Sequence, residues 1–155
     1  KDKRTSVEYG YDLIYGWLME DIAIKFLERE GLEVEKTGVD ATRVFLKERQ
    51  ISSFSDVKIR DKYFDITFDT RDMWIGTNSL DIRLSKWNAL RSVGGGILCF
   101  SPAGIAVIDV SKEEDTGVWL NPAWGFKEAV SIGNMRSKIM SPILVTQFTL
   151  LKELL

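Results

Sequence analysis

Two segments with alternating polarity carry the residues of this sequence that are most suited to chemistry. The first, Lys62–Phe68, reads KYFDITF and contains Asp65; the second, Ser79–Ser85, reads SLDIRLS and contains Asp81 and Arg83. Alternation of this kind is typical of half-buried strands whose polar side chains share one face. If the two strands pair, both aspartates and the arginine lie together. Two carboxylates beside a cation are groups that can hold a divalent metal against a phosphate.

A third acid, Glu20, lies in the clearest predicted helix. Residues 11–30 place apolar side chains at helical spacing, and Gly31 ends the pattern where a left-handed residue is favoured. Small and apolar residues surround Glu20 one turn away, so two interpretations stay open. Its stem packs at the edge of the apolar stripe while its carboxylate reaches water, or it is a partly desolvated acid that points into a site.

The remaining elements surround the two acidic segments. Residues 56–60 alternate and are followed by the turn pair Asp61-Lys62, which predicts an antiparallel hairpin with the Asp65 strand. Residues 85–93 fit a short helix. Residues 97–100 and 105–110 are almost continuously apolar, as central strands covered on both faces are. We also expect strands at 32–35, 42–47 and 127–132, irregular structure at 70–78 and 119–126, and a helix from Pro142.

Composition limits the classes of protein. The chain has 155 residues, 45% hydrophobic, with five tryptophans, a formal net charge of −2 and no histidine. This indicates one folded domain, residues 1–155, and excludes histidine-based triads and histidine-ligated zinc. The single Cys99 lies in an apolar strand and has no disulfide partner within the chain. No signal peptide or apolar run of membrane-spanning length is present, so we expect a cytoplasmic protein with no membrane contact.

The order of these elements resembles the PD-(D/E)XK nuclease superfamily, which includes restriction-like endonucleases and archaeal Holliday-junction resolvases. The resemblance covers roughly residues 11–110 and leaves 111–155 as a C-terminal extension. It implies an α/β, restriction-endonuclease-like fold with a central mixed β-sheet flanked by helices. In this resemblance Phe64-Asp65 corresponds to the family's Pro-Asp pair, Asp81-Ile82-Arg83 to its acid-x-lysine element, and Glu20 to its helix acid.

The resemblance implies a Mg²⁺-dependent (or Mn²⁺-dependent) endonuclease that hydrolyses DNA phosphodiester bonds, including those of branched or structured DNA. Asp65 and Asp81 would bind the metal, Glu20 would be an outer ligand, and Arg83 would supply the catalytic cation. Arg83 departs from the family's lysine, since a guanidinium stays protonated and cannot act as a general base, although it can still grip phosphate. Lys86 could substitute only if the strand ends before it.

A second interpretation needs no catalysis. Asp65 and Asp81 would then be ordinary solvated strand acids in a catalytically inactive nuclease-like domain, which serves as a nucleic-acid-binding or protein-interaction module. DNA is the expected partner of the nuclease and of a nucleic-acid-binding module, a protein partner stays open for the inactive domain, and a homodimer would suit an enzyme that cuts two strands. Beside Arg83, the basic residues expected to contact the nucleic acid are Lys58, Arg60, Lys62, Arg71, Lys86 and Arg91.

Overall fold

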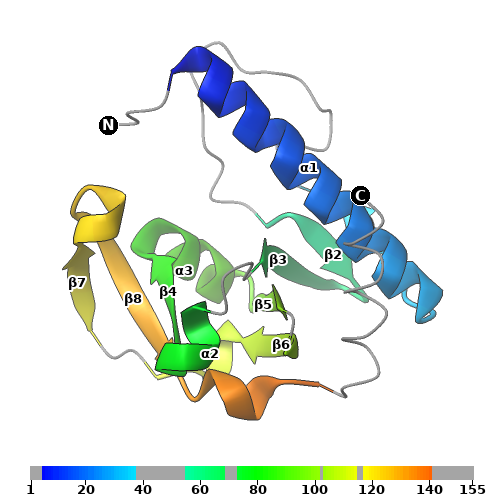
Figure 1. The fold of residues 1–155 in the computed structure, drawn as a ribbon. Helices are drawn as coiled ribbons and strands as arrows, with labels where there is room; N and C mark the ends of the chain where they lie inside the picture. The colour runs from blue at the N-terminus through cyan, green and yellow to red at the C-terminus, as the bar shows by residue number, and fades with distance from the viewer. Residues whose placement is uncertain (1–4, 38–54, 69–72, 102, 115–116, 141–155) are drawn as a thin grey trace.

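The protein has a mixed α/β fold built from two β-sheets and three α-helices in its described part (Figure 1). The computed structural model describes residues 5–37, 55–68, 73–101, 103–114 and 117–140, apart from the side chains of residues 9–16 and 73. The strand expected at 42–47, the helix expected from Pro142 and the basic residue Arg71 lie outside these residues. None of the described helices is long and apolar enough to cross a membrane.

The larger sheet, sheet A, has five strands in the order β1-β2-β3-β5-β6. Its strands are β1 Glu35–Lys36, β2 Val57–Ile59, β3 Lys62–Phe68, β5 Gly96–Ser101 and β6 Gly104–Asp109. Strands β3 and β5 are parallel and the other neighbours are antiparallel, which confirms the expected mixed sheet. The predicted hairpin is the β2–β3 pair, and its turn residues Arg60 and Asp61 both have positive φ. Strand β5 is buried along its whole length, as expected for a central strand.

The smaller sheet, sheet B, corrects the expected pairing of the two acidic strands. Strand β4, Ser79–Arg83, pairs with β8, Lys127–Gly133, which pairs with β7, Val118–Asn121. The prediction that β4 pairs with the Asp65 strand is therefore wrong. Alternation shows that β4 has an apolar face but does not show which strand it joins. Its Leu80 and Ile82 pack into a core shared with β8.

Two segments expected to be irregular contain regular structure. Helix α2, Met73–Thr77, lies within residues 70–78. Strand β7 begins at Val118 and runs into residues 119–126, and the 3-10 helix Pro122–Trp124 lies within them. Short elements of this kind carry too few apolar residues to show a period. Residues 118–133, which follow the part of the chain covered by the resemblance, supply two of the three strands of sheet B.

The helices lie on opposite faces of sheet A. Helix α1, Ser6–Arg29, begins with a capping box between Thr5 and Glu8 and packs against Phe64 and Ile66 of β3. Helix α3, Leu84–Ser92, begins directly after β4 and packs its buried Trp87 and Leu90 into the other core, together with sheet B. Figure 1 shows α1 crossing sheet A beside β2 and β3, away from α3 and sheet B. Asp65 must point to one of these two sides.

A strained residue closes the β7–β8 turn. Phe126 is 66% exposed and has a φ of 61°, a left-handed conformation that is costly for a bulky residue. We expect Phe126→Asn to raise the free energy of unfolding by about 0.5–1 kcal/mol, because asparagine tolerates this conformation and little packing is lost. Urea unfolding measures the change. Leu120→Asn is the matched control, since Leu120 is exposed in the same hairpin but extended, and a gain of equal size there would contradict the explanation by strain.

Candidate active site

Asp65 is a buried carboxylate in the middle of sheet A. It lies opposite Ile97 of β5 and is only 6% exposed. Because Phe64 and Ile66 point toward α1, alternation directs Asp65 to the α3 side. There the Nζ of Lys86, in the first turn of α3, lies 3.3 Å from Oδ1 and 3.1 Å from Oδ2 of Asp65. Lys86 therefore contacts both oxygens of the carboxylate.

A second carboxylate, Asp56, stands immediately before β2 and beside Asp65. Its backbone N–H donates to Phe64 O at 3.1 Å, and its Oδ2 accepts from the N–H of Ile66 at 2.9 Å. Both contacts are with β3, on either side of Asp65. The hairpin thus fixes the side chain of Asp56 beside the carboxyl-terminal half of β3.

The surroundings raise the pKa of Asp65 to about 7 from an ordinary value of 3.8. Burial is the largest cause and the negative charge of Asp56 is the second, while the charge of Lys86 and its hydrogen bond act in the opposite direction. The short contacts with Lys86 taken alone would indicate a low pKa. Desolvation and a like charge outweigh one ammonium group that itself remains partly hydrated, so the upward direction holds. The positive charge around Asp65 is therefore too small to offset its burial and the negative charge of Asp56.

Arg83 adjoins this centre through the start of α3. It is the N-cap residue, and Lys86 is the third helical residue after it. Arg83 and Lys86 are thus three residues apart at the start of the helix, a spacing at which side chains are neighbours. The guanidinium of Arg83 makes no ion pair or hydrogen bond with another described residue. Strand β4 ends at Arg83, so the condition under which Lys86 could replace the family's lysine is met.

Asp81 belongs to a different network. Its Oδ1 accepts from Ser131 Oγ at 2.6 Å and its Oδ2 accepts from Asn121 Nδ2 at 3.4 Å, both across sheet B. The expectation that Asp65 and Asp81 share a face of one sheet is therefore wrong. The physical reason is the separate pairing of β4, which directs Asp81 toward β8 and β7.

Glu20 also lies apart from Asp65. It is 8% exposed on α1, whose Ala23 and Ile24 belong to the core on the other face of sheet A. The charges that act on Asp65 are those of Asp56 and Lys86. Within the described residues no group of three or more His, Cys, Asp or Glu side chains is placed to hold a metal. The structure thus does not assemble the expected trio of Glu20, Asp65 and Asp81. Burial of Glu20 agrees with a desolvated acid, but on the wrong side of the sheet.

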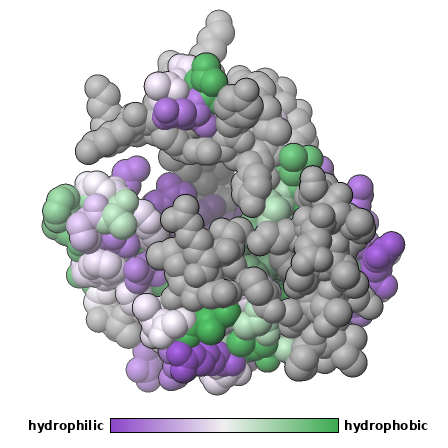
Figure 2. All heavy atoms as spheres, viewed as in Figure 1, coloured by the Kyte–Doolittle hydropathy of each residue, from purple (hydrophilic) through white to green (hydrophobic). Residues whose placement is uncertain are grey.

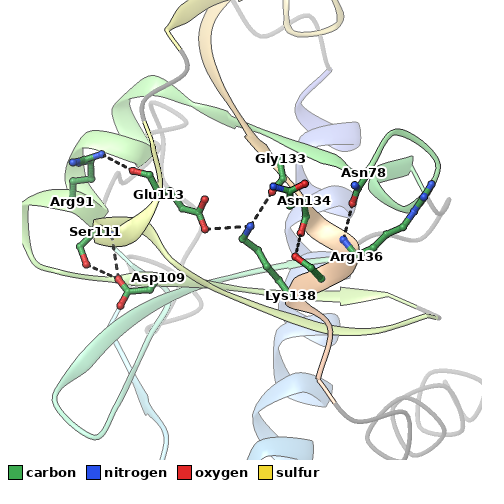
Figure 3. A network of polar contacts seen from close by, with 10 residues as sticks. Asn78, Arg91, Asp109, Ser111, Glu113, Gly133, Asn134, Arg136 and Lys138 are labelled. Atoms are coloured by element: carbon green, nitrogen blue, oxygen red, sulfur yellow. Dashed lines mark hydrogen bonds and ion pairs between the residues drawn. The ribbon is translucent and has the colours of Figure 1, made fainter.

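Most of the expected DNA-contacting cations have local contacts. Lys62 forms an ion pair with Asp109 at 2.9 Å, and Lys58 lies over the Tyr63 ring at 5.3 Å. Figure 3 shows Arg91 donating to the backbone oxygen of Glu113, at 3.3 Å, in a polar network that also ties Glu113 to Lys138. Lys58, Lys62 and Arg91 are therefore engaged in contacts with neighbouring residues and do not form a free cationic patch. Arg60 is exposed at the β2–β3 turn.

The sequence around the β2–β3 turn indicates where Asp56 lies. A two-residue turn at Arg60 and Asp61 fixes the hairpin register and pairs Val57 with Phe64, which places Asp56 beside Asp65. Lys86 was expected to contact nucleic acid, and no local pattern pairs it with Asp65, because the two residues meet only when α3 packs back onto sheet A.

Comparisons with known proteins give no assignment. No protein-family model matches the chain, and no curated protein matches it.

Proposed function

We propose that this protein is a divalent-metal-dependent endonuclease of DNA with a restriction-endonuclease-like arrangement, whose centre is Asp56, Asp65 and Lys86. The observation that carries the proposal is the state of Asp65: a carboxylate buried beside a second carboxylate, with its pKa raised to about 7 and one lysine bonded to both of its oxygens. Strongly shifted acids beside a specific charge partner are concentrated at functional sites. This assignment replaces Asp81 and Arg83 with Asp56 and Lys86.

The donor set fits a hard cation. Asp65 offers its carboxylate from β3 and Asp56 from the residue before β2, and Mg²⁺ commonly uses only one or two protein carboxylates, with water and substrate phosphate as its other ligands. The deficit of positive charge at Asp65 is what a bound divalent cation would relieve. These two aspartates would hold the ion, which when bound polarises the phosphate and lowers the pKa of a water.

The two basic residues at the start of α3 have separate roles. Lys86 orients the carboxylate of Asp65 through both oxygens and places its ammonium where negative charge develops on the phosphate. Lys86 thus supplies, one turn into α3, a lysine ammonium in place of the one that Arg83 does not provide. Arg83, beside it at the N-cap, is suited to bind a phosphate bidentately.

One observation favours a second candidate, a catalytically inactive module that binds nucleic acid. Lys86 already contacts both oxygens of Asp65, so the two side chains pair without any metal. Buried ion pairs of this kind also serve only to hold a fold together. Arg83 would still bind phosphate in such a protein.

Cleavage of labelled duplex and four-way-branched DNA tests the proposal. We expect cleavage with Mg²⁺ or Mn²⁺, none in EDTA, and a loss of at least ~100-fold in Asp56→Asn, because the metal supplies several kcal/mol of charge stabilisation. Asp56→Asn keeps the side-chain oxygen that accepts from Ile66, so the fold is retained. Cleavage that persists in EDTA, or in Asp56→Asn, contradicts the proposal. Salt-dependent binding without cleavage indicates the inactive module.

A further inference from the structure

The outer face of sheet B carries a row of side chains that leads away from the candidate centre. Ala129 of β8 lies opposite Arg83 of β4 on one side and opposite Trp119 of β7 on the other, so the three residues share one face. Ala129 is fully buried, although its neighbours in the row are larger and partly exposed. The small side chain of Ala129 thus lies between the side chains of Arg83 and Trp119 on this face.

Hydrogen bonds hold the indole in place. Trp119 Nε1 donates to Ser131 Oγ at 3.1 Å, and Ser131 Oγ donates to Asp81 Oδ1 at 2.6 Å. Asn121 Nδ2 donates to the other oxygen of Asp81 at 3.4 Å. Trp119 nevertheless leaves 39% of its surface exposed. An exposed tryptophan fixed through a chain of polar contacts is a preorganised aromatic surface, because little side-chain freedom remains to be lost on binding.

This aromatic surface is continuous with the candidate centre. Strand β4 leads directly into α3, so Arg83 stands between Trp119 and Lys86. The β7–β8 turn lies at the same end of sheet B as Arg83, since Lys127 pairs with Asn121 just before that turn. Figure 1 places this hairpin beside the start of α3. Lys127 is exposed on the same face as Trp119.

The charges on this face suit a polyanion. The side chains of Arg83 and Lys127 make no ion pair with any other residue in the described ranges. The one acid of the face, Asp81, is satisfied by Ser131 and Asn121. The apolar Val118 and Leu120 alternate to the opposite face of β7, so the Trp119 face itself is mostly polar. Figure 2 shows hydrophobic and hydrophilic residues mixed over this hairpin, without an unbroken apolar surface.

We propose that Trp119 is a stacking site for an unpaired base of a nucleic-acid strand, with Arg83 binding an adjacent phosphate and Lys127 adding positive charge. Aromatic side chains in a cationic groove are how proteins hold single-stranded nucleic acid, because every base offers a π-face. The inference rests on the proposed function, which places the scissile phosphate at Asp56, Asp65 and Lys86. It narrows the substrate to DNA with an unpaired segment beside the cleaved bond.

Binding in EDTA tests this site without cleavage. Fluorescence anisotropy compares a labelled single-stranded oligothymidylate with a fully paired duplex of the same length. We expect Trp119→Leu to weaken single-strand binding by about 10-fold or more, and duplex binding by much less, while Trp119→Phe stays within about 3-fold of the parent. Ser131→Ala removes the hydrogen bond that holds the indole, and we expect its loss of single-strand affinity to lie between those of Trp119→Phe and Trp119→Leu. Val93→Ala, an exposed apolar residue after α3, is the control and keeps the parent affinity.

Three results would overturn the inference. The first is an unchanged single-strand affinity in Trp119→Leu. The second is a loss of duplex affinity in Trp119→Leu as large as the loss of single-strand affinity. The third is a change in the oligomeric state of Trp119→Leu on gel filtration, which would mark β7 as a protein-binding edge. Failure of the proposed function looks different, because Trp119-dependent single-strand binding then persists without any metal-dependent cleavage. Conversely, metal-dependent cleavage of DNA with unpaired segments that does not respond to Trp119→Leu would leave the function standing and remove the stacking site.

Discussion

Asp65→Asn is expected to lower metal-dependent DNA cleavage by about 10³-fold or more, since several kcal/mol of metal-derived charge stabilisation is lost. Asp81→Asn is expected to retain more than about a tenth of the cleavage, a change within about 1.4 kcal/mol. Both residues are strand aspartates of similar sequence surroundings. They differ in place, because Asp65 adjoins Asp56 and Lys86, whereas Asp81 accepts hydrogen bonds from Ser131 and Asn121 in sheet B.

Single-turnover cleavage of labelled DNA at saturating Mg²⁺ measures both variants. Asp21→Asn serves as the neutral control, since Asp21 of α1 forms a half-exposed ion pair with Lys36 of β1. Asparagine can accept the hydrogen bonds that Asp81 accepts, so circular dichroism should show an unchanged fold for that variant. The reverse order of activities, with Asp81→Asn inactive and Asp65→Asn active, would restore Asp81 and Arg83 as the centre and reject Asp56 and Lys86.

Local patterns in the sequence predict the part of this structure that depends on neighbours along the chain. Alternation in Lys62–Phe68 placed Phe64 and Ile66 on one face and Asp65 on the other. The pair Asp61-Lys62 predicted the β2–β3 hairpin, although the turn itself is Arg60-Asp61, one residue earlier. The apolar runs predicted β5 and β6 as strands and the full burial of β5, but β6 is the edge strand of sheet A and its Val107 is exposed, so the central place expected for it is wrong. Each of these features depends on contacts within a strand or across a short turn, where residue spacing alone determines the geometry.

Long-range pairing could not be predicted in the same way. Strand β4 has one apolar face, and nothing in residues 79–83 shows whether its partner is the Asp65 strand or β8. The actual partner, β8, begins more than forty residues later in the chain. This single choice decides whether Asp81 belongs to the candidate site. Lys86 is a similar case, because it reaches Asp65 only through the packing of α3 against sheet A. Asp56 differs from both, since the hairpin register alone places it beside Asp65.

The protein is expected to lose stability as the pH rises from about 4 to about 7. In this interval the folded state keeps the proton of Asp65, whose pKa is about 7, while the unfolded state has released it near 3.8. The unfolded state binds fewer protons, so the free energy of unfolding falls with pH. The slope from this group is at most about 1.4 kcal/mol per pH unit, and the total is roughly 4 kcal/mol before the curve flattens above pH 7.

Asp109 acts in a different range. Its pKa is lowered, chiefly by the hydrogen bond from Ser111 and further by Lys62, so its contribution is present above about pH 4 and is lost as the pH falls below its ordinary value of 3.8. The two carboxylates therefore act on opposite sides of pH 4. Urea unfolding at fixed pH values from 3 to 9 separates them.

Asp65→Asn should remove most of the slope of unfolding free energy between pH 4 and 7 and should be more stable than the parent at pH 8, because the amide copies the neutral acid.

Mg²⁺ should stabilise the parent at pH 8, by about 2.7 kcal/mol at 100 times its dissociation constant, since the ion binds the ionised carboxylates of the folded state. It should do so far less at pH 5, where Asp65 holds its proton, and hardly at all in Asp65→Asn. Equal stabilisation of both proteins by Mg²⁺ at pH 8 would show that the ion binds elsewhere. An unchanged slope in Asp65→Asn would show that another group sets it. Binding and pH dependence measured without DNA thus test the metal site independently of any cleavage assay.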